Sequence, residues 1–295
     1  ANMLYPGYYL FEDRAKRIVD LVAPKNDWTT QDVAKMLLDV TSITAPKVAK
    51  NLIKSLDKNT FSPSEKTVLH ILENWKGNFD NNEIAPVIYS RFIYEFQKNT
   101  FADEMGKGFH QFVNTPFVEK VLPVQAARMQ SVWWDNISTK DTVETKQEIV
   151  TMSFKKAFSL LENQLGANVA AWKWKRVISV EHEHAVGEVA VLRKYFNVGP
   201  FVTDGGDQVL NNQIYDIDST GYYKVIAGPS TRRIVDFSDV ENSLEIVPTG
   251  QSGRIFSAHY KDQASKYLNG DFVKMKLNSK EIAQSKNVLV LKAEK

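Results

Sequence analysis

The hydrophobic positions in the first half of the chain recur every three to four residues, the spacing that places them on one side of a helix. The clearest helix start is at Ser62, which is followed by Pro63 and, at the third helical position, by Glu65. Thr29 and Asp32 repeat the same capping pattern. These patterns predict helices over residues 12–22, 29–40, 44–56, 62–76, 83–101, 116–121 and 143–165.

Short β-type runs replace the helical pattern in the second half, and glycine becomes frequent. Five glycines occur up to Gly166, whereas nine occur between Gly187 and Gly270. We predict strands over 176–180, 213–217, 231–237, 244–247, 272–277 and 287–291, the last apolar enough to be buried on both faces. Ser257 is expected to be the N-cap of a helix that ends at Gly270. A helical half followed by a sheet predicts an α+β fold.

The composition is that of an ordinary globular protein and narrows the function classes. Of 295 residues, 43% are hydrophobic and 24% are charged, enough for a large core. A net charge of +2, with basic residues scattered along the chain, gives no reason to expect nucleic acid as a partner. No apolar run reaches the length of a membrane span. Because cysteine is absent, disulfides, thiolate metal sites and cysteine nucleophiles are excluded.

Two polar clusters are candidates for metal binding. His182 and His184 would point to one face of a strand and could present two imidazoles to zinc, or they could belong to a purely structural strand. No third ligand is suggested nearby, so we predict no metal site there. The Asp-Gly-Gly-Asp run at residues 204–207 has the carboxylates and glycines of a calcium loop but not the spacing of an EF-hand. It is equally compatible with a loop that borders a cleft and with a plain turn.

The familiar catalytic motifs are missing. The glycine-rich segments match neither a phosphate-binding loop nor the GxSxG pattern of a nucleophilic serine. His70, His110 and His259 have no distinctive neighbours that would mark a Ser-His-Asp triad. These patterns therefore identify no nucleophile within the chain.

Three short motifs follow one another between Gly228 and Gln263. They are Gly228-Pro229-Ser230 with Arg232 and Asp236, then Pro248 with Gly250-Gln251-Ser252-Gly253, then Ser257 with His259-Tyr260 and Asp262-Gln263. In order and spacing they resemble the C-terminal signature of the penicillin acylase (penicillin amidase) family of N-terminal-nucleophile hydrolases. That family includes cephalosporin acylases and acyl-homoserine-lactone acylases. The run from Phe196 to Phe201 also resembles a family motif, which favours a structural strand and turn around the two histidines.

The resemblance implies roles for several residues. Asn2, in an Ala-Asn step before a Tyr-Pro turn, would donate its side-chain amide to the oxyanion of the tetrahedral intermediate. Arg17, which precedes Ile18 on a predicted helix, would line the active-site cleft. Asp204, Gly205, Gly206 and Asp207 would border the substrate cleft.

The resemblance also implies where the chain belongs in a hydrolase. In the family, a serine at the start of the larger chain attacks the amide carbonyl and its own α-amino group is the base. Since this chain begins with Ala1, it would be the C-terminal portion of the larger (beta) chain and inactive alone. Its expected partners are the upstream part of the same precursor (the alpha chain and the N-terminal part of the beta chain) and a small-molecule substrate such as a β-lactam antibiotic or an acyl-homoserine lactone. The alternative is a non-catalytic binding or scaffold protein of the same fold.

The implied architecture is part of a four-layer αββα core with an inserted helical domain. Residues 1–23 would be the N-terminal segment of the core, 24–168 the inserted helical domain, and 169–295 the C-terminal strands and helix. Strands that lack upstream partners would leave edges exposed, so the isolated chain is expected to dimerise or to need the missing part. The resemblance implies no cofactor in this chain, possible calcium in the full-length protein, and a periplasmic or extracellular location after processing of a zymogen.

Overall fold

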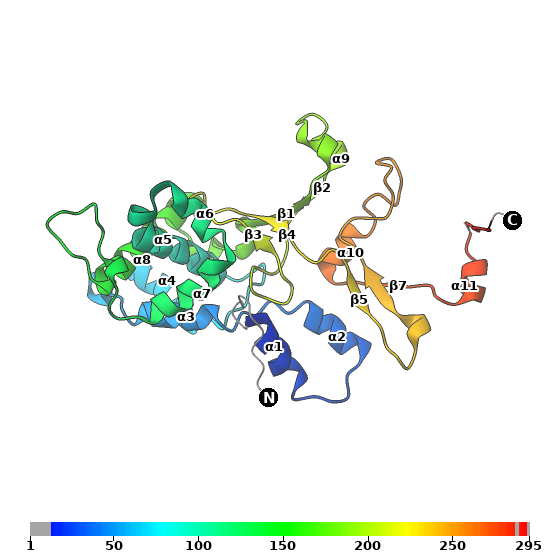
Figure 1. Cartoon of the computed structure of the whole chain (residues 1–295), viewed down its shortest axis with the longest axis horizontal. Coiled ribbons are helices and arrows are strands. Elements are labelled where there is room, and N and C mark those ends of the chain that lie inside the picture. The colour runs from blue at the N-terminus through cyan, green and yellow to red at the C-terminus, as the bar shows by residue number, and fades with distance from the viewer. Residues whose placement is uncertain (1–12, 287–288, 294–295) are drawn as a thin grey trace. The chain divides into compact units, whose positions relative to one another are not determined.

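The computed structural model describes residues 13–286 and 289–293. The backbone of the chain in Figure 1 divides into two compact units. Unit 1 contains residues 13–23, 39–180 and 201–228 of the described chain, and unit 2 contains residues 24–38, 181–200 and 229–293. Among the described residues, no helix is both long enough and apolar enough to cross a bilayer.

Most of the regular secondary structure of unit 1 is helical. They are α1 (Asp13–Val22), α3 (Ala45–Ile53), α4 (Pro63–Asn74), α5 (Ala85–Met105), α6 (Phe109–Val113), α7 (Pro116–Ala127) and α8 (Lys146–Leu165). Short 3-10 turns lie between these helices or after the last of them, at Lys58–Thr60, Gly106–Gly108, Val132–Trp134, Val169–Ala171 and Trp174–Arg176. The helical prediction for this half is therefore confirmed, with α5 and α7 extending beyond the predicted ends.

The helix starts follow from local side-chain chemistry. Ser62 accepts the N–H of Glu65 at 3.2 Å, and the Glu65 carboxylate accepts the N–H of Ser62 at 2.7 Å. Thr29 and Asp32 form the same reciprocal pair at the start of α2 (Thr30–Leu37) in unit 2. Each box satisfies two backbone donors that the first turn would otherwise leave free.

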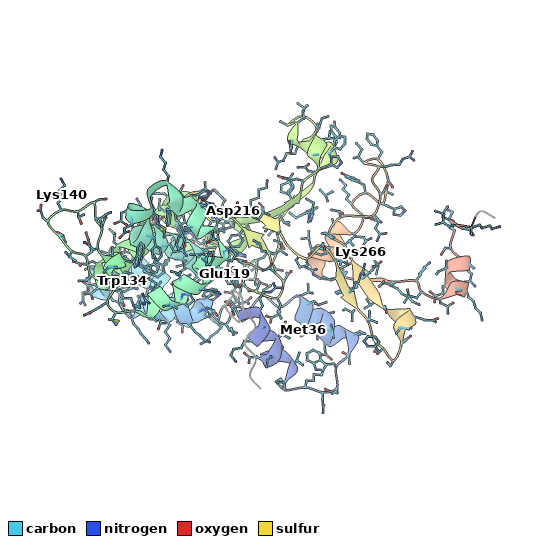
Figure 2. The ribbon with its side chains drawn as sticks, in the orientation of Figure 1. Met36, Glu119, Trp134, Lys140, Asp216 and Lys266 are labelled. Atoms are coloured by element: carbon cyan, nitrogen blue, oxygen red, sulfur yellow. The ribbon has the colours of Figure 1, made fainter. Side chains whose placement is uncertain are left out.

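The core of unit 1 lies between the two long helices α5 and α8. Phe92 and Phe96 of α5 and Phe154 of α8 are almost completely buried. Phe92 meets Phe154 edge to face, with ring centroids 5.4 Å apart. Trp134, marked in Figure 2, extends this packing, because its ring lies 6.0 Å from that of Phe96. These aromatic side chains thus form the centre of this core.

A small sheet closes unit 1. β1 (Ile178–His182) pairs in parallel with β4 (Tyr223–Ala227), and β4 pairs antiparallel with β3 (Ile214–Tyr215). The register aligns Ile178 with Tyr223 and Val180 with Val225. The predicted strand at 176–180 is therefore displaced by two residues, and β4 was not predicted. The chain passes through β2 (Val198–Phe201) before it returns to unit 1.

Unit 2 is built on a three-stranded antiparallel sheet. Its strands are β5 (Arg232–Ile234), β6 (Leu244–Ile246) and β7 (Val273–Lys274), in the order β5-β6-β7. The helices are α2, α9 (Arg193–Phe196), α10 (Ala264–Asn269) and α11 (Ser279–Ala283), with 3-10 turns at Ala185–Glu188 and Val240–Asn242. The predicted strands at 231–237, 244–247 and 272–277 are confirmed in shorter form.

Two predictions for the C-terminal region are wrong. Ser257 does not cap a helix: its hydroxyl accepts the N–H of His259 in a local turn, and α10 begins only at Ala264. The run predicted as a buried strand at 287–291 is described only from Leu289. Leu289 and Leu291 belong to no strand and are 84% and 87% exposed, because no described strand pairs with this segment.

Candidate functional site

The predicted cleft loop at residues 204–207 is held rigidly within unit 1. The carboxylate of Asp204 accepts the N–H of Asn81 at 2.7 Å. Gly205 donates its N–H to the carbonyl of Phe79 at 3.0 Å, and its own carbonyl accepts the indole N–H of Trp174 at 2.9 Å. These contacts give Asp204 and Gly205 structural roles in fixing the loop.

The second half of the loop lies against a cavity. At Gly206 the backbone passes so close to Phe79 that a Cβ would lie 2.9 Å from the ring. The side chain of Asp207 lines the cavity. Burial raises the pKa of the Asp207 carboxyl, against the opposing effect of hydrogen bonds with Gln208 and Asn212. Of the four predicted cleft residues, Asp207 is the one whose side chain lines this cavity.

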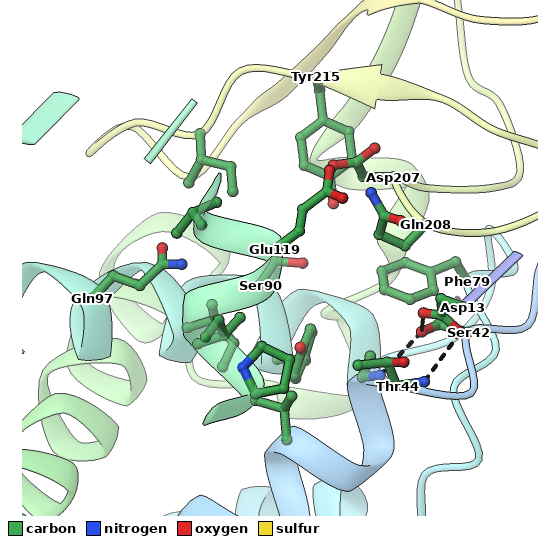
Figure 3. Close-up of a pocket in the computed structure, with 18 residues that line it drawn as sticks. Asp13, Ser42, Thr44, Phe79, Ser90, Gln97, Glu119, Asp207, Gln208 and Tyr215 are labelled. Atoms are coloured by element: carbon green, nitrogen blue, oxygen red, sulfur yellow. Dashed lines mark hydrogen bonds between the residues drawn. The ribbon is translucent and has the colours of Figure 1, made fainter. Parts of the chain in front are cut away.

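The cavity has a volume of about 130 Å³ and lies entirely within unit 1 (Figure 3). Residues from α3, α5, α7 and the segment 207–217 surround it. Most of its wall is apolar and includes Val48, Phe79, Ile93, Val118 and Leu122. A cavity of about this size can hold one small aromatic molecule.

Glu119 places a second carboxyl group at this cavity. Figure 3 shows its carboxyl, carried by α7, turned toward that of Asp207. Burial raises the pKa of Glu119 to about 7, and the negative charges of Asp207 and Asp13 act in the same direction. Glu119 Oε2 is buried and has no hydrogen-bond partner in the described part of the chain. The cavity therefore contains an acidic group that can change its charge near neutral pH.

Asp13 ties the start of α1 to the start of α3 at the edge of the cavity. The carboxylate is 2% exposed. It accepts the hydroxyl of Ser42 at 2.6 Å and the N–H groups of Ile43 and Thr44 at 2.8 and 3.2 Å. A carboxylate at a helix N-terminus satisfies free donors and interacts favourably with the helix dipole.

Asp13→Ala is expected to lower the free energy of unfolding by about 2–4 kcal/mol, because it removes these bonds and leaves buried donors without an acceptor. Asp20→Ala is the matched control on the same helix, since Asp20 is exposed and forms a salt bridge with Lys16 one turn away. Its effect is expected to stay within about 0.5 kcal/mol. Urea denaturation of both variants tests this, and equal effects would contradict it.

Arg17 is engaged in an ion pair. Its Nε donates to Asp39 Oδ1 at 3.0 Å and its Nη2 donates to Asp39 Oδ2 at 2.5 Å. The hydrogen bond to Asp39 raises the pKa of the Arg17 guanidinium. The side chain is 23% exposed and does not line the cavity. Asn2 lies outside the described residues, so the predicted pairing of Asn2 with Arg17 across a cleft stays a prediction.

The two histidines of unit 2 do not lie on one strand. β1 ends at His182, and burial lowers the pKa of the His182 imidazole. His184 follows the strand, where its Nδ1 accepts the N–H of Val186 at 3.1 Å. Within residues 13–286 and 289–293, no three His, Cys, Asp or Glu side chains are arranged to hold a metal ion.

Residues of the first and third C-terminal motifs have structural roles in unit 2. The guanidinium of Arg232 stacks on the ring of Tyr267 and donates to its carbonyl at 2.7 Å. Tyr267 in turn donates its hydroxyl to the carbonyl of Pro229 at 2.6 Å. The side chain of Gln263 accepts the N–H of Val247 at 3.2 Å. These bonds join β5 and β6 to α10. Residues of the motifs therefore hold the strands and the helix of this unit together.

Glu119 and Gln97 contribute to the cavity but were not predicted. Both lie on helices in contexts that the sequence does not distinguish from ordinary helical positions. Only the packing of α5 against its neighbours brings them to one cavity.

The architecture is that of a known class of hydrolase. The thermostable penicillin G acylase from Alcaligenes faecalis matches the chain with a TM-score of 0.54 and 16% sequence identity. The match covers 98% of this chain and 54% of that one. The prediction of an α+β chain with the penicillin acylase fold is therefore confirmed. Residues 2–284 match the sequence model of the penicillin amidase family, and the chain belongs to that family.

Named relatives are acyl-homoserine lactone acylases. QuiP of Pseudomonas aeruginosa is 23% identical over 309 residues, and QuiP of Pseudomonas syringae pathovar tomato is 26% identical over 294 residues. These alignments cover 91% and 90% of this chain but 36% and 34% of the relatives. The chain thus spans about a third of the length of the relatives it matches.

Proposed function

We propose that the protein carrying this chain is an acylase that hydrolyses the amide bond of N-acylated small molecules. The observation that carries the proposal is the family match, which extends over residues 2–284. Because its relatives are named acyl-homoserine lactone acylases, N-acyl-homoserine lactones are the first substrate class to test. Penicillins are the second, since the structural neighbour is a penicillin G acylase.

In the proposed reaction the nucleophile is a serine supplied from outside residues 1–295. Its hydroxyl oxygen attacks the amide carbonyl carbon and its proton passes to the serine's own α-amino group. The resulting oxyanion accepts a hydrogen bond from the side-chain amide of Asn2. The amine then leaves with the proton, and water hydrolyses the acyl ester to release the acid.

Arg17 is proposed as the arginine that lines the cleft. The bond to Asp39 fixes the direction of its guanidinium, and the side chain is 23% exposed, which supports a contact with a polar substrate group. Asp39 is itself held, because its Oδ1 also accepts the N–H of Thr41 at 3.1 Å. The loop at 204–207 is proposed to border the same cleft.

The proposal includes a partner, a location and a maturation step. The partner is the upstream part of the same precursor, joined after zymogen processing in the periplasm or outside the cell. Large exposed apolar side chains in unit 2 support such a partner, since Phe237 and Phe256 are 91% and 92% exposed. Without it, the isolated chain is proposed to dimerise. Calcium in the full-length protein would need ligands from outside the described residues, because these contain no group of three His, Cys, Asp or Glu side chains that could hold a metal ion. No step of the proposed reaction uses calcium.

The test is Asn2→Ala in the full-length protein that carries these residues. The variant is expected to lower kcat by about 10²- to 10³-fold with little change in KM, because the amide acts mainly on the oxyanion. The measurement is release of homoserine lactone from an N-acyl-homoserine lactone, with penicillin G assayed in parallel.

Asn26→Ala is the control for this experiment. Asn26 is exposed and lies close in sequence but belongs to unit 2, so turnover should be unchanged. If the unsubstituted full-length protein hydrolyses neither substrate class, the proposal is wrong and the non-catalytic binding or scaffold alternative takes its place. If Asn2→Ala keeps full activity, the assignment of the oxyanion donor is wrong while the hydrolase remains.

A further inference from the structure

The cavity of unit 1 has two carboxyl groups on one side, an amide on the other and a mainly apolar wall, with Ser90 between the two sides (Figure 3). Glu119 and Asp207 lie on one side, and Gln97 lies on the other. Val48, Ile93 and Leu122 are among the apolar residues that complete the wall. Such an arrangement suits a short ligand that is polar at both ends and apolar between them.

Gln97 is the strongest sign that the cavity is built to bind something. The residue is 1% exposed, and its side-chain Oε1 has no hydrogen-bond partner among the described residues. Buried polar atoms are nearly always paired, because an unpaired one costs about 1–3 kcal/mol. The amide can be turned to present either oxygen or nitrogen, so a hydroxyl group, which both donates and accepts, satisfies it in either orientation.

The opposite side of the cavity is suited to a cation. Glu119 Oε2 is buried and has no partner within residues 13–286 and 289–293, and the carboxyl of Asp207 faces the same space. Among the described residues that line the cavity, the ionisable neighbours on other elements are Asp13, Tyr89 and Tyr215. Burial raises the pKa of both tyrosines, which therefore remain neutral phenols. Arg14 acts on Asp207 from α1 but does not line the cavity.

The size of the cavity suits one ring as the apolar part of the ligand. Its volume is about 130 Å³, and a cavity of about 150 Å³ holds benzene. A phenyl ring with one methylene group fits this volume and extends toward both polar sides.

We propose that this cavity is a binding site for a primary arylalkyl amine whose ring carries a hydroxyl group. The ammonium group binds the Glu119 carboxylate beside Asp207, the ring lies among the apolar residues, and the hydroxyl bonds to the amide of Gln97. The site stands on the cavity alone and does not depend on the proposed hydrolysis.

Titration calorimetry of the full chain with three probes tests the proposal. The expected order of affinity is 4-hydroxybenzylamine, then benzylamine, then benzyl alcohol. Loss of the ring hydroxyl should weaken binding about three- to tenfold, and loss of the ammonium should weaken it further, since a charge-assisted bond is the stronger one. No binding of 4-hydroxybenzylamine at millimolar concentration, or equal affinity for benzylamine and benzyl alcohol, would show that the proposal is wrong.

Two variants test which residue binds each end of the ligand. Glu119→Gln should weaken both amines while leaving benzyl alcohol unchanged. Gln97→Met keeps the shape of the side chain without its amide, and it should reduce 4-hydroxybenzylamine to the affinity of benzylamine without affecting benzylamine itself. Thermal unfolding shows that each variant is folded before titration. Equal loss for all three probes in either folded variant would contradict the assignment.

The pH dependence gives an independent readout. Since a protonated Glu119 cannot bind an ammonium as an ion pair, the affinity of both amines should be about tenfold lower at about pH 6 than at about pH 8. Glu119→Gln should abolish this dependence. Glu104→Gln is the matched control, because the pKa of Glu104 is also raised to about 7 but the residue lies outside the cavity. A dependence that persists in Glu119→Gln would overturn the assignment.

Discussion

Trp174→Ala is expected to lower the free energy of unfolding of unit 1 by about 3–5 kcal/mol. The indole is 0% exposed and lies between the aromatic side chains of Phe79, Tyr215 and Tyr223. Truncation would leave a cavity that these rings cannot fill without moving. It would also remove the indole N–H that the carbonyl of Gly205 accepts at 2.9 Å.

Trp174→Phe separates packing from hydrogen bonding. It keeps an aromatic ring in the space but leaves the Gly205 carbonyl without its donor, so the expected loss is smaller, about 1–3 kcal/mol. Chemical denaturation followed by circular dichroism measures both variants. If Trp174→Ala costs no more than Trp174→Phe, the packing argument is wrong and the hydrogen bond carries the effect.

Because Trp174 bonds to the loop that leads to the cavity, ligand binding gives a second measurement for Trp174→Ala. Gly205 directly precedes the segment that brings Asp207 to the cavity. Loss of Trp174 should therefore weaken binding of 4-hydroxybenzylamine more than a core truncation elsewhere does. Leu161→Ala is the comparison, because Leu161 is 1% exposed on α8 and does not line the cavity.

Helix positions could be predicted from the sequence because their determinants are local. The box at Ser62 and Glu65 forms as expected, and Gly166 ends α8 in a backbone conformation with positive φ. These signals act through residues three or four positions apart, so one stretch of sequence contains the whole interaction.

Strand positions were predicted less accurately because strands depend on partners far away in the sequence. β4, from Tyr223 to Ala227, becomes a strand by pairing with Ile178–Val180 and with Ile214 and Tyr215. The Leu289–Leu291 segment has a stronger apolar pattern but no described strand beside it, and it stays exposed. The hydrophobic pattern alone therefore predicted a strand at Leu289–Leu291, where none is described, and missed the strand β4.

The candidate site was predictable only in part for the same reason. The glycine-rich loop at 204–207 could be singled out, since its composition is unusual. Glu119 could not, because a glutamate on a helix gives no sign that its neighbours across the fold are Asp207 and Asp13. The roles of Asn2 and Arg17 and the domain limits at residues 23 and 168 stay predictions.

Gly205→Ala is expected to lower the free energy of unfolding by about 3 kcal/mol or more, through strain in the backbone. Gly205 has φ of +108°, a conformation that residues with a side chain rarely adopt. An added Cβ would also lie 2.3 Å from the carbonyl oxygen of Asn211, which is backbone and cannot rotate away. The loop would have to move as a whole, and with it Asp207.

Gly108→Ala is the matched control, because nothing lies within 4 Å of a Cβ added there and its φ is not positive. Removing a glycine at such a position should leave stability unchanged or raise it slightly, by about 0.5 kcal/mol. Thermal unfolding of the two variants side by side measures the difference. Equal stability would mean that the loop can adopt another conformation without loss, and the rigid placement of Asp207 in the cavity could then not be maintained.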